Sequence, residues 1–317
     1  MSWTFEDVMP RARVVSDNDY AGDPDGLVQL AQLVLSPSVV VPFVIGSHLP
    51  AHGFTNTVDS AARAAVAARR VVELCGRDVN VIAGVERALT SRTEPIESDA
   101  ARAIVAEAMR DDTDLPLFVA CGGGLTEIAS AWLIEPRICE RVTLVWIGGH
   151  EHPGTAEPPP GGGDLEFNTS IDPLAAQVVF NDSDLPIWQV PRNVYRTAIA
   201  SRAELMVRMR PHGELGHHLF DALADAYERV KSMDMQLGEV WVMGDSPLVS
   251  LTALWTGFEP APASSPWVTV PCPRILDSGL YEARPDGRPL RVFTDVDSRL
   301  MLEDLYAKLA LHAEGQR

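Results

Sequence analysis

Four aspartates lie within nine residues near the start of the chain. They are Asp17, Asp19, Asp23 and Asp25. No Lys or Arg lies between Val14 and Ser36, and like charges a few ångströms apart raise one another's pKa unless a positive charge separates them. Either these carboxylates point apart, or a cation holds them together. Carboxylate oxygens are hard ligands, which favours Ca²⁺ or Mg²⁺ over zinc.

The acidic stretch joins a predicted strand to a predicted helix. Val14 and Val15 indicate a buried strand, Gly22 permits a sharp turn, and Pro24 suits the first turn of a helix. Apolar residues then recur at helical spacing at Leu27, Leu30, Ala31 and Val34. In an open α/β sheet, ligands bind at the carboxyl ends of the strands, where this turn is expected to lie.

Two of the carboxylates could have a structural role in the helix in place of metal binding. Asp23 would cap the helix, and Asp25 would lie in its first turn, where a negative charge is favourable. Asp19 has no such use, because an Asp at the end of a strand has no helix to cap.

Further turns of the same kind follow along the chain. The predicted strand over 116–121 runs into three glycines and a helix, and such a turn exposes backbone groups to a ligand. It lacks the Gly-Lys-Ser/Thr that completes a phosphate loop. The predicted strand over 239–243 leads to Asp245, a second aspartate at a strand end. Glu166 and Asn168 follow a Pro/Gly-rich loop over 151–164.

The whole chain alternates strands with helices. Predicted strands cover 38–46, 79–84, 116–121, 142–148, 186–190, 239–243, 268–270 and 290–294. Predicted helices cover 57–75, 98–110, 201–235 and 298–312. This α/β order predicts a mostly parallel, Rossmann-like sheet with helices on both faces. No Pro/Ser-rich linker divides the chain into equal parts, so we expect a single domain over residues 1–317.

Composition narrows the class of partner. The net charge of −18 argues against binding to nucleic acid or to an anionic membrane. The cysteines are scattered and form no CxxC pair, which favours a reduced, cytoplasmic protein. The N-terminus lacks the pattern of a signal peptide, and the apolar stretch over 27–47 is interrupted by Gln and Pro, so no membrane span is expected.

Taken in order, these motifs resemble those of the inosine-uridine-preferring nucleoside hydrolases, the N-ribohydrolases. The family opens on Asp-x-Asp-Pro-Gly-x-Asp-Asp and continues with Gly-Pro-Leu-Thr-Asn-Ile-Ala, Met-Gly-Gly, Glu-Phe-Asn, Asp-Pro-x-Ala-Ala and a late Asp. The similar segments here are residues 17–25, 123–129, 147–149, 166–168, 172–176 and Asp245.

The resemblance implies a nucleoside-hydrolase-like fold and hydrolysis of the N-glycosidic bond of a ribonucleoside, with release of base and ribose. It implies a homodimer or homotetramer and a role in purine or pyrimidine salvage. Asp19 would take a proton from the attacking water. The implied Ca²⁺ ligands are Asp19, Asp23 or Asp25, the carbonyl of Thr126, and Asp245. The implied substrate contacts are Asp23, Ser47, Glu166 and Asn168.

Two departures from the family pattern matter. The consecutive Asp pair of the family is replaced by residues 23–26, which leaves open whether Asp23 or Asp25 binds the metal. Many members carry a His just before the late Asp, which helps the base to leave, and here that position is Gly244. His48 and His150 both follow predicted strands and are the candidates to supply the acid instead.

Two rival functions fit part of the pattern. In a haloacid-dehalogenase-type phosphatase, Asp17 would be the nucleophile, Asp19 the general acid and Asp245 an Mg²⁺ ligand. That class leaves residues 166–168 unexplained and expects a Gly-Thr that does not follow Asp19. The second rival is a non-catalytic protein of the same fold that binds a ribose-like ligand.

Overall fold

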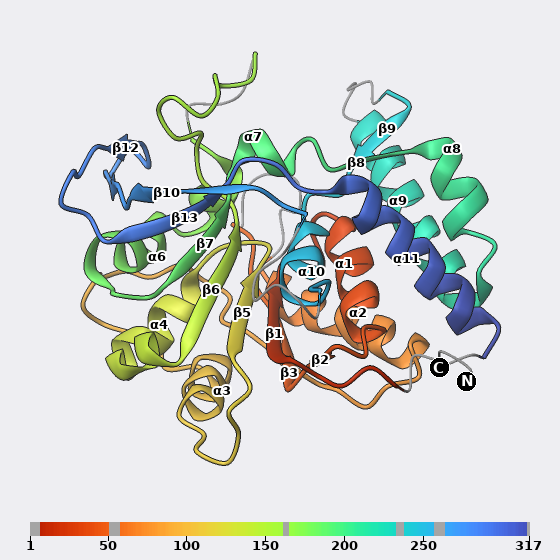
Figure 1. Cartoon of the computed structure of the whole chain (residues 1–317), viewed down its shortest axis with the longest axis horizontal. Coiled ribbons are helices and arrows are strands. Elements are labelled where there is room, and N and C mark those ends of the chain that lie inside the picture. Colours follow the sequence, from red (N-terminus) through yellow and green to blue (C-terminus); the bar gives the residue numbers. More distant parts are fainter. Residues whose placement is uncertain (1–6, 51–57, 161–164, 233–237, 257–263, 316–317) are drawn as a thin grey trace.

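The computed structural model describes residues 7–50, 58–160, 165–232, 238–256 and 264–315. Within these ranges nine strands form one sheet in the order β10-β13-β7-β6-β5-β1-β3-β4, with β2 paired to β1 (Figure 1). These strands are β1 (Ala12–Asn18), β2 (Val39–Val40), β3 (Phe43–Gly46), β4 (Asn80–Ala83), β5 (Leu117–Cys121), β6 (Val142–Ile147), β7 (Ile187–Val190), β10 (Trp267–Pro271) and β13 (Pro289–Phe293). Their pairings are parallel except that of β10 with β13, which confirms the predicted sheet.

Helices cover both faces of this sheet, as the sequence predicts. They are α1 (Asp25–Val34), α2 (Ser60–Leu74), α3 (Asp99–Ala108), α4 (Thr126–Ile134), α5 (Phe167–Ile171), α6 (Pro173–Gln177), α7 (Arg192–Tyr195), α8 (Arg202–Glu204), α9 (Gly213–Ser232), α10 (Pro247–Thr252) and α11 (Ser298–Ala313), with 3₁₀ segment η2 (Pro136–Glu140) and π segments η3 (Val178–Asp182) and η4 (Leu205–Met209). In the ranges that the structure describes, none of them is long and apolar enough to cross a membrane.

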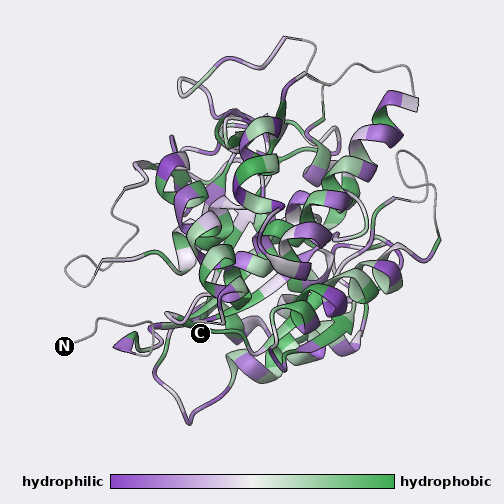
Figure 2. Cartoon of the chain, turned by 90° about the vertical axis from the view of Figure 1, so that its right-hand side faces the viewer, coloured by the Kyte–Doolittle hydropathy of each residue, from purple (hydrophilic) through white to green (hydrophobic). Residues whose placement is uncertain are grey.

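The core consists of two layers, one on each side of the sheet. One layer joins the sheet to α1, α2, α9, α10 and α11, and the other joins it to α3, α4 and α6 (Figure 1). Val14 belongs to the first layer and Val15 to the second, because successive side chains of a strand point to opposite faces. A strand that is buried on both faces carries consecutive apolar residues, which explains the pair Val14-Val15 in β1. Green and purple segments alternate along the helical ribbons in Figure 2, as expected for helices with one buried face.

Several predicted elements change in detail. The strand over 38–46 is divided by Pro42, which has no N–H to give to a sheet, into β2 and β3. The predicted helix over 201–235 is divided into α8, η4 and α9, with a break near Pro211. Residue 57 of the predicted second helix, residues 233–235 and loop residues 161–164 lie outside the described residues.

One prediction is wrong in its pairing. The pattern over 239–243 predicts a strand of the main sheet. It forms β9 (Val240–Val242), which pairs antiparallel with β8 (Ile199–Ser201) in a separate two-stranded sheet. Its three residues are only partly covered, and Val240 and Val242 are exposed. Asp245 therefore approaches the site from a neighbouring layer and not from the main sheet. A further small sheet pairs β11 (Arg274–Ile275) with β12 (Tyr281–Glu282).

The contact between β3 and α2 tests how closely these layers pack. A Cβ added at Gly46 would lie 2.3 Å from the backbone nitrogen of Ala65, which cannot move without moving the helix. We expect Gly46→Ala to lower the free energy of unfolding by about 1–3 kcal/mol, the usual cost of an overpacked core. Urea denaturation measures this change. Gly238→Ala is the matched control, because nothing lies within 4 Å of a Cβ there. Equal stability of the two variants would contradict the close packing.

Candidate active site

A cavity of about 600 Å³ opens beside the acidic turn. The turn contributes Asp19, Ala21, Gly22, Asp23 and Pro24. The facing walls contribute Leu49, Arg63, Ala67, Phe167, Ala226, Arg229, Val230 and Trp241. This volume lies in the range of small-molecule sites. The cavity lies where β1 ends and α1 begins, which is the position that the sequence predicts for a ligand.

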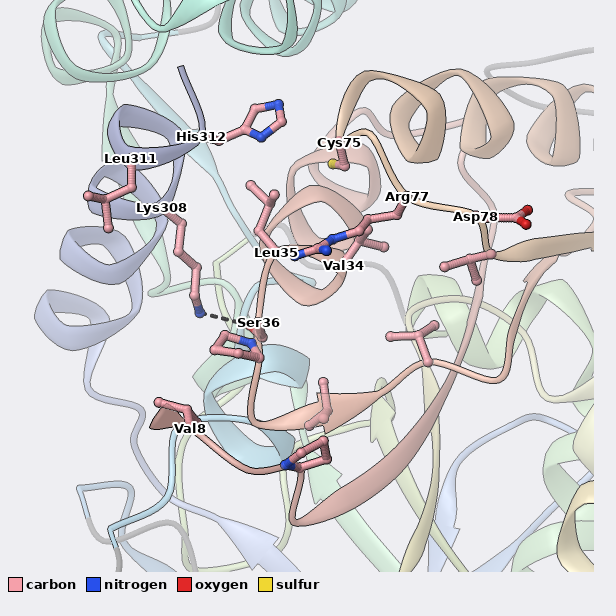
Figure 3. Close-up of a pocket in the computed structure, with 15 residues that line it drawn as sticks. Val8, Val34, Leu35, Ser36, Cys75, Arg77, Asp78, Lys308, Leu311 and His312 are labelled. Atoms are coloured by element: carbon pink, nitrogen blue, oxygen red, sulfur yellow. Dashed lines mark hydrogen bonds between the residues drawn. The ribbon is translucent and has the colours of Figure 1, made fainter. Parts of the chain in front are cut away.

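A second cavity, of about 550 Å³, lies at the opposite end of the sheet (Figure 3). It is lined by Pro10, Val39 and Val79, which lie at or just before the starts of their strands, and by the C-terminal end of α11. The Nζ atom of buried Lys308 donates hydrogen bonds to Ser36 and Asp304 there. None of the predicted site residues lines this cavity, so the first cavity is the candidate site.

Asp19 is the centre of the candidate site. Its side chain lies at the end of β1, is only 5% exposed, and lines the cavity. Burial, followed by the negative charges of Asp245, Asp23 and Asp17, raises the pKa of Asp19 well above its usual value. The predicted repulsion between the carboxylates is therefore present in the folded chain.

Asp25 and Asp245 are joined directly, although they are far apart in the sequence. The backbone N–H of Asp245 donates to Oδ2 of Asp25 at 3.0 Å, and Nδ2 of Asn18 donates to Oδ2 of Asp245 at 2.9 Å. Burial raises the pKa of Asp245 to about 7. Burial, with the charges of Asp23 and Asp245, also raises the pKa of Asp25. Asp25 therefore holds the turn that carries Asp245.

The capping role expected for Asp23 is not what the structure has. The residue at the N-cap of α1 is Pro24, and no side chain caps this helix. Oδ1 of Asp23 accepts a long hydrogen bond, 3.4 Å, from the backbone N–H of Asp25 and another, 3.3 Å, from Nε1 of Trp241. Asp23 thus links the acidic turn to β9 across the cavity.

These carboxylates could hold a divalent cation, but only after a rearrangement of side chains. No three His, Cys, Asp or Glu side chains in the described ranges are gathered closely enough to hold a metal ion. Two glycines leave room beside the carboxylates: a Cβ at Gly123 would lie 3.3 Å from Oδ2 of Asp19, and one at Gly26 would lie 3.2 Å from Oδ2 of Asp245. An all-oxygen donor set with several carboxylates fits a hard cation.

The glycine turn after β5 brings the other motifs to Asp19. Nδ2 of Asn168 donates to the carbonyls of Gly122, at 3.0 Å, and Ile147, at 2.7 Å. Nε1 of Trp146 donates to the carbonyl of Gly123 at 3.0 Å. Asn168 therefore ties the ends of β5 and β6 together next to Asp19. Its Nδ2 is occupied by the protein, and Asn168 is not among the described residues that line the cavity, so its contact with the ribose stays a prediction.

The predicted metal ligand at Thr126 is placed at the first residue of α4. Its hydroxyl donates to Oδ2 of Asp172 at 2.7 Å. Asp172 caps α6 through the backbone N–H of Ala175, with Pro173 at the first helical position. The side chain of Thr126 is therefore committed to Asp172, and its carbonyl as a metal ligand stays a prediction.

Glu166 is held by the protein through both carboxylate oxygens. It caps α5, and its partners are the backbone N–H groups of Gly149, Asn168 and Thr169 and the hydroxyls of Thr169 and Tyr195. Each of these hydrogen bonds is between 2.8 and 3.1 Å long. Glu166 thus orders the loop that places Phe167 in the cavity. Its expected contact with ribose hydroxyls stays a prediction.

The side chain of Ser47 is hydrogen-bonded to Asp17, and neither residue lines the cavity. The hydroxyl of Ser47 donates to Oδ1 of Asp17 at 2.7 Å. Burial raises the pKa of Asp17 to about 8, and its side chain is 1% exposed. A phosphatase nucleophile must reach its substrate, so the position of Asp17 does not fit the haloacid-dehalogenase alternative. The predicted contact of Ser47 with substrate also stays a prediction.

The two histidines proposed as acids are buried outside the cavity lining. Burial lowers the pKa of His48 and that of His150. Nε2 of His150 lies 3.4 Å from the backbone nitrogen of Glu166, from which it accepts a hydrogen bond. Neither histidine is among the described residues that line the cavity.

The structure adds residues that the sequence did not single out. Phe167 is 49% exposed and lines the cavity. Its place between Glu166 and Asn168 in the Glu-Phe-Asn motif was the signal in the sequence that could have identified it. A Cβ at Gly244 would lie 3.4 Å from Cδ2 of Tyr195. The ring of Tyr195 therefore lies beside the position where many family members carry a His. No local pattern marks it.

Comparison with known proteins agrees with this geometry. The sequence model of the family described as inosine-uridine preferring nucleoside hydrolase matches residues 54–299. The inosine-uridine preferring nucleoside hydrolases of Leishmania major and Crithidia fasciculata are 52% and 49% identical over 69 residues. These alignments span 22% of this chain and only 19% of each relative.

Solved structures extend the likeness over nearly the whole chain. A plant nucleoside hydrolase superposes with a TM-score of 0.71 at 17% identity, covering 95% of this chain and 99% of that one. A purine-preferring ribonucleoside hydrolase from Gardnerella vaginalis gives 0.69 at 18% identity over the same shares. At this identity the superpositions establish the fold, and the sequence model establishes the relationship. The chain belongs to the inosine-uridine preferring nucleoside hydrolase family.

Proposed function

We propose that this protein hydrolyses the N-glycosidic bond of a ribonucleoside, with Asp19 as the general base and Ca²⁺ as the cofactor. The observation that carries the proposal is the gathering of four carboxylates at one cavity. Asp19, which is buried, and Asp23, which is exposed, line the cavity, and the buried Asp25 and Asp245 lie behind them. Membership of the family supports the same reaction class.

The chain's own groups account for the main steps. Asp19 accepts a proton as the water oxygen attacks the anomeric carbon, and the bond to the base nitrogen breaks with its electron pair leaving on the base. A bound divalent cation would orient the ribose hydroxyls, lower the pKa of a water and offset the charge on Asp19. Positive charge develops on the sugar, and Asp23, Asp25 and Asp245 stabilise it electrostatically.

The apolar part of the cavity suits the base. Phe167, Trp241 and Leu49 line it together with Asp19 and Asp23. An aromatic face in a cavity offers stacking to any base, because every base has a π-face. A homodimer or homotetramer, a cytoplasmic location and a role in salvage stay predictions from the sequence.

Ca²⁺ is expected to raise the melting temperature of the metal-free protein, and more at about pH 8 than at about pH 5. The folded protein binds the Asp245 proton more tightly than the unfolded chain does. Without the cation, stability therefore falls as pH rises from 3.8 to about 7. The cation needs ionised ligands, so its effect is largest above that range. At 100 times the Kd it stabilises by about 2.7 kcal/mol.

Differential scanning fluorimetry across this pH range measures the shift. Asp245→Asn should lose most of it, because the variant lacks one ligand charge. Asp112→Asn is the control, since Asp112 pairs with Arg110 away from the cavity. A shift of equal size in Asp245→Asn and in the native chain would contradict the ligand role of Asp245.

Asp19→Asn is expected to reduce turnover of a ribonucleoside by about 10²–10⁴-fold, the usual effect of losing a general base. The amide cannot take the proton, and it also removes a charge that the cation needs. Release of reducing sugar from a panel of nucleosides measures turnover, and circular dichroism checks the fold. Asp112→Asn should retain activity. If the native chain binds nucleosides but cleaves none, the non-catalytic binding protein is favoured.

The glycine at position 244 predicts dependence on the leaving group. Without a His there, p-nitrophenyl riboside should be cleaved faster than inosine, because nitrophenolate leaves without a proton. Gly244→His should lower the ratio of the rate with p-nitrophenyl riboside to the rate with inosine. A Cβ at this position makes only ordinary contacts, since the nearest atom to it is Cδ2 of Tyr195 at 3.4 Å.

The rate ratio of the two substrates is the measurement, and Gly244→Ala is the control that adds bulk without a proton donor. Equal rates for both substrates in the native chain would mean that another group protonates the base. His150 and Tyr195 would then be the first to replace.

A further inference from the structure

Two guanidinium groups line a cavity that is otherwise built around carboxylates. Arg63 belongs to α2 and Arg229 to α9, and both share the cavity with Asp19 and Asp23. The whole chain holds 44 acidic against 26 basic residues. A neutral ribonucleoside has no anionic group for either arginine to bind.

Neither arginine is committed to a strong internal partner. Arg229 lies exposed in the last turn of α9. Among the described residues its guanidinium has no carboxylate within ion-pair distance, and its charge acts on Asp23, which lines the same cavity. Arg63 pairs with Asp59 at 3.0 Å, with side chains 62% and 56% exposed. Exposed pairs of this kind contribute little to stability, so a ligand can replace Asp59.

We propose that this cavity selects substrates that carry an anionic group, which Arg63 and Arg229 bind while the ribose lies at Asp19. The proposal rests on the proposed function and names its substrate class. Arginine binds phosphate and carboxylate through a planar pair of N–H donors. The anionic group takes no part in bond breaking, so the hydrolysis is unchanged.

Two kinds of substrate carry such a group. One is a ribonucleoside 5′-monophosphate, and the other is a ribonucleoside whose base bears a carboxylate. A cavity of about 600 Å³ is large enough for either. Matched pairs of compounds separate the two sources: inosine against inosine 5′-monophosphate, and uridine against orotidine, which is uridine with a carboxylate on its base.

The alternative is that the arginines belong to a solvated rim. A cation in the last turn of a helix is favourable by itself, and Arg229 meets that description. Lys231 lies in the same last turn, pairs with Glu228 and does not line the cavity. On α2, which carries Arg63, the matching control is Arg70: it pairs with Glu73 and Glu214 and does not line the cavity. Lys231→Ala and Arg70→Ala therefore remove the same charge outside the site.

The experiment measures kcat/KM for the four compounds with the native chain and the variants. We expect the anionic member of one pair to be preferred about tenfold or more, the effect of one hydrogen bond to a charged group. Arg229→Ala and Arg63→Ala should each reduce that preference about tenfold. Arg229→Lys keeps the charge but loses the planar pair of donors, so its preference for the anionic compound should lie between those of the native chain and Arg229→Ala. The control variants should keep the native preference.

The outcomes are separable. Equal or better cleavage of the neutral members, or equal losses in Lys231→Ala and Arg229→Ala, would overturn the proposal and leave the proposed function intact. If none of the four is cleaved, the proposed function fails. Calorimetry then decides the inference: tighter binding of the anionic members that weakens in Arg229→Ala supports it, and equal binding overturns it.

Discussion

The repulsion between carboxylates at the end of β1 is the constraint on which the rest of the site depends. Asp17, Asp19, Asp25 and Asp245 are all buried, and each has its pKa raised by that burial. Buried charges of one sign are stable only when they are protonated or offset. The fold supplies neutral donors, such as Ser47 to Asp17 and Asn18 to Asp245, but the described residues place no arginine or lysine in contact with Asp19.

Rigidity around these carboxylates comes from glycines and from hydrogen bonds to the backbone. A Cβ at Gly122 would lie 2.3 Å from Nδ2 of Asn18, so the turn after β5 can lie against β1 only without a side chain. Asn168 and Trp146 then fix the carbonyls of that turn. Glu166 fixes the loop that carries Asn168. The surroundings of Asp19 are thus held by groups that make no contact with the cavity, which preorganises the site for charge.

Local patterns predicted the parts of this arrangement that depend on neighbours in sequence. The order of strands and helices and the acidic turn follow from spacing within a few residues. The placement of β9 does not, because a short half-exposed strand has the same pattern in a main sheet or in a separate pair. The contact between Asp23 and Trp241 joins residues 218 positions apart, and that of Asp25 with Asp245 joins residues 220 apart. Such contacts depend on the packing of whole layers, which spacing alone does not encode.

Gly244 and the two arginines of the cavity are both features that bear on the charge of the substrate. On the proposed function, the glycine next to Tyr195 and Asp25 supplies no proton donor, so negative charge would stay on the base as its bond to ribose breaks. Arg63 and Arg229 are the cations that share the cavity with Asp19. In the proposed substrate complex, this positive charge binds the anionic group of the substrate, which takes no part in the departure of the base. The glycine at position 244 and the two arginines then act on different groups of the substrate. An arginine binds an anionic group across the whole working pH range, because its guanidinium stays charged where a histidine titrates.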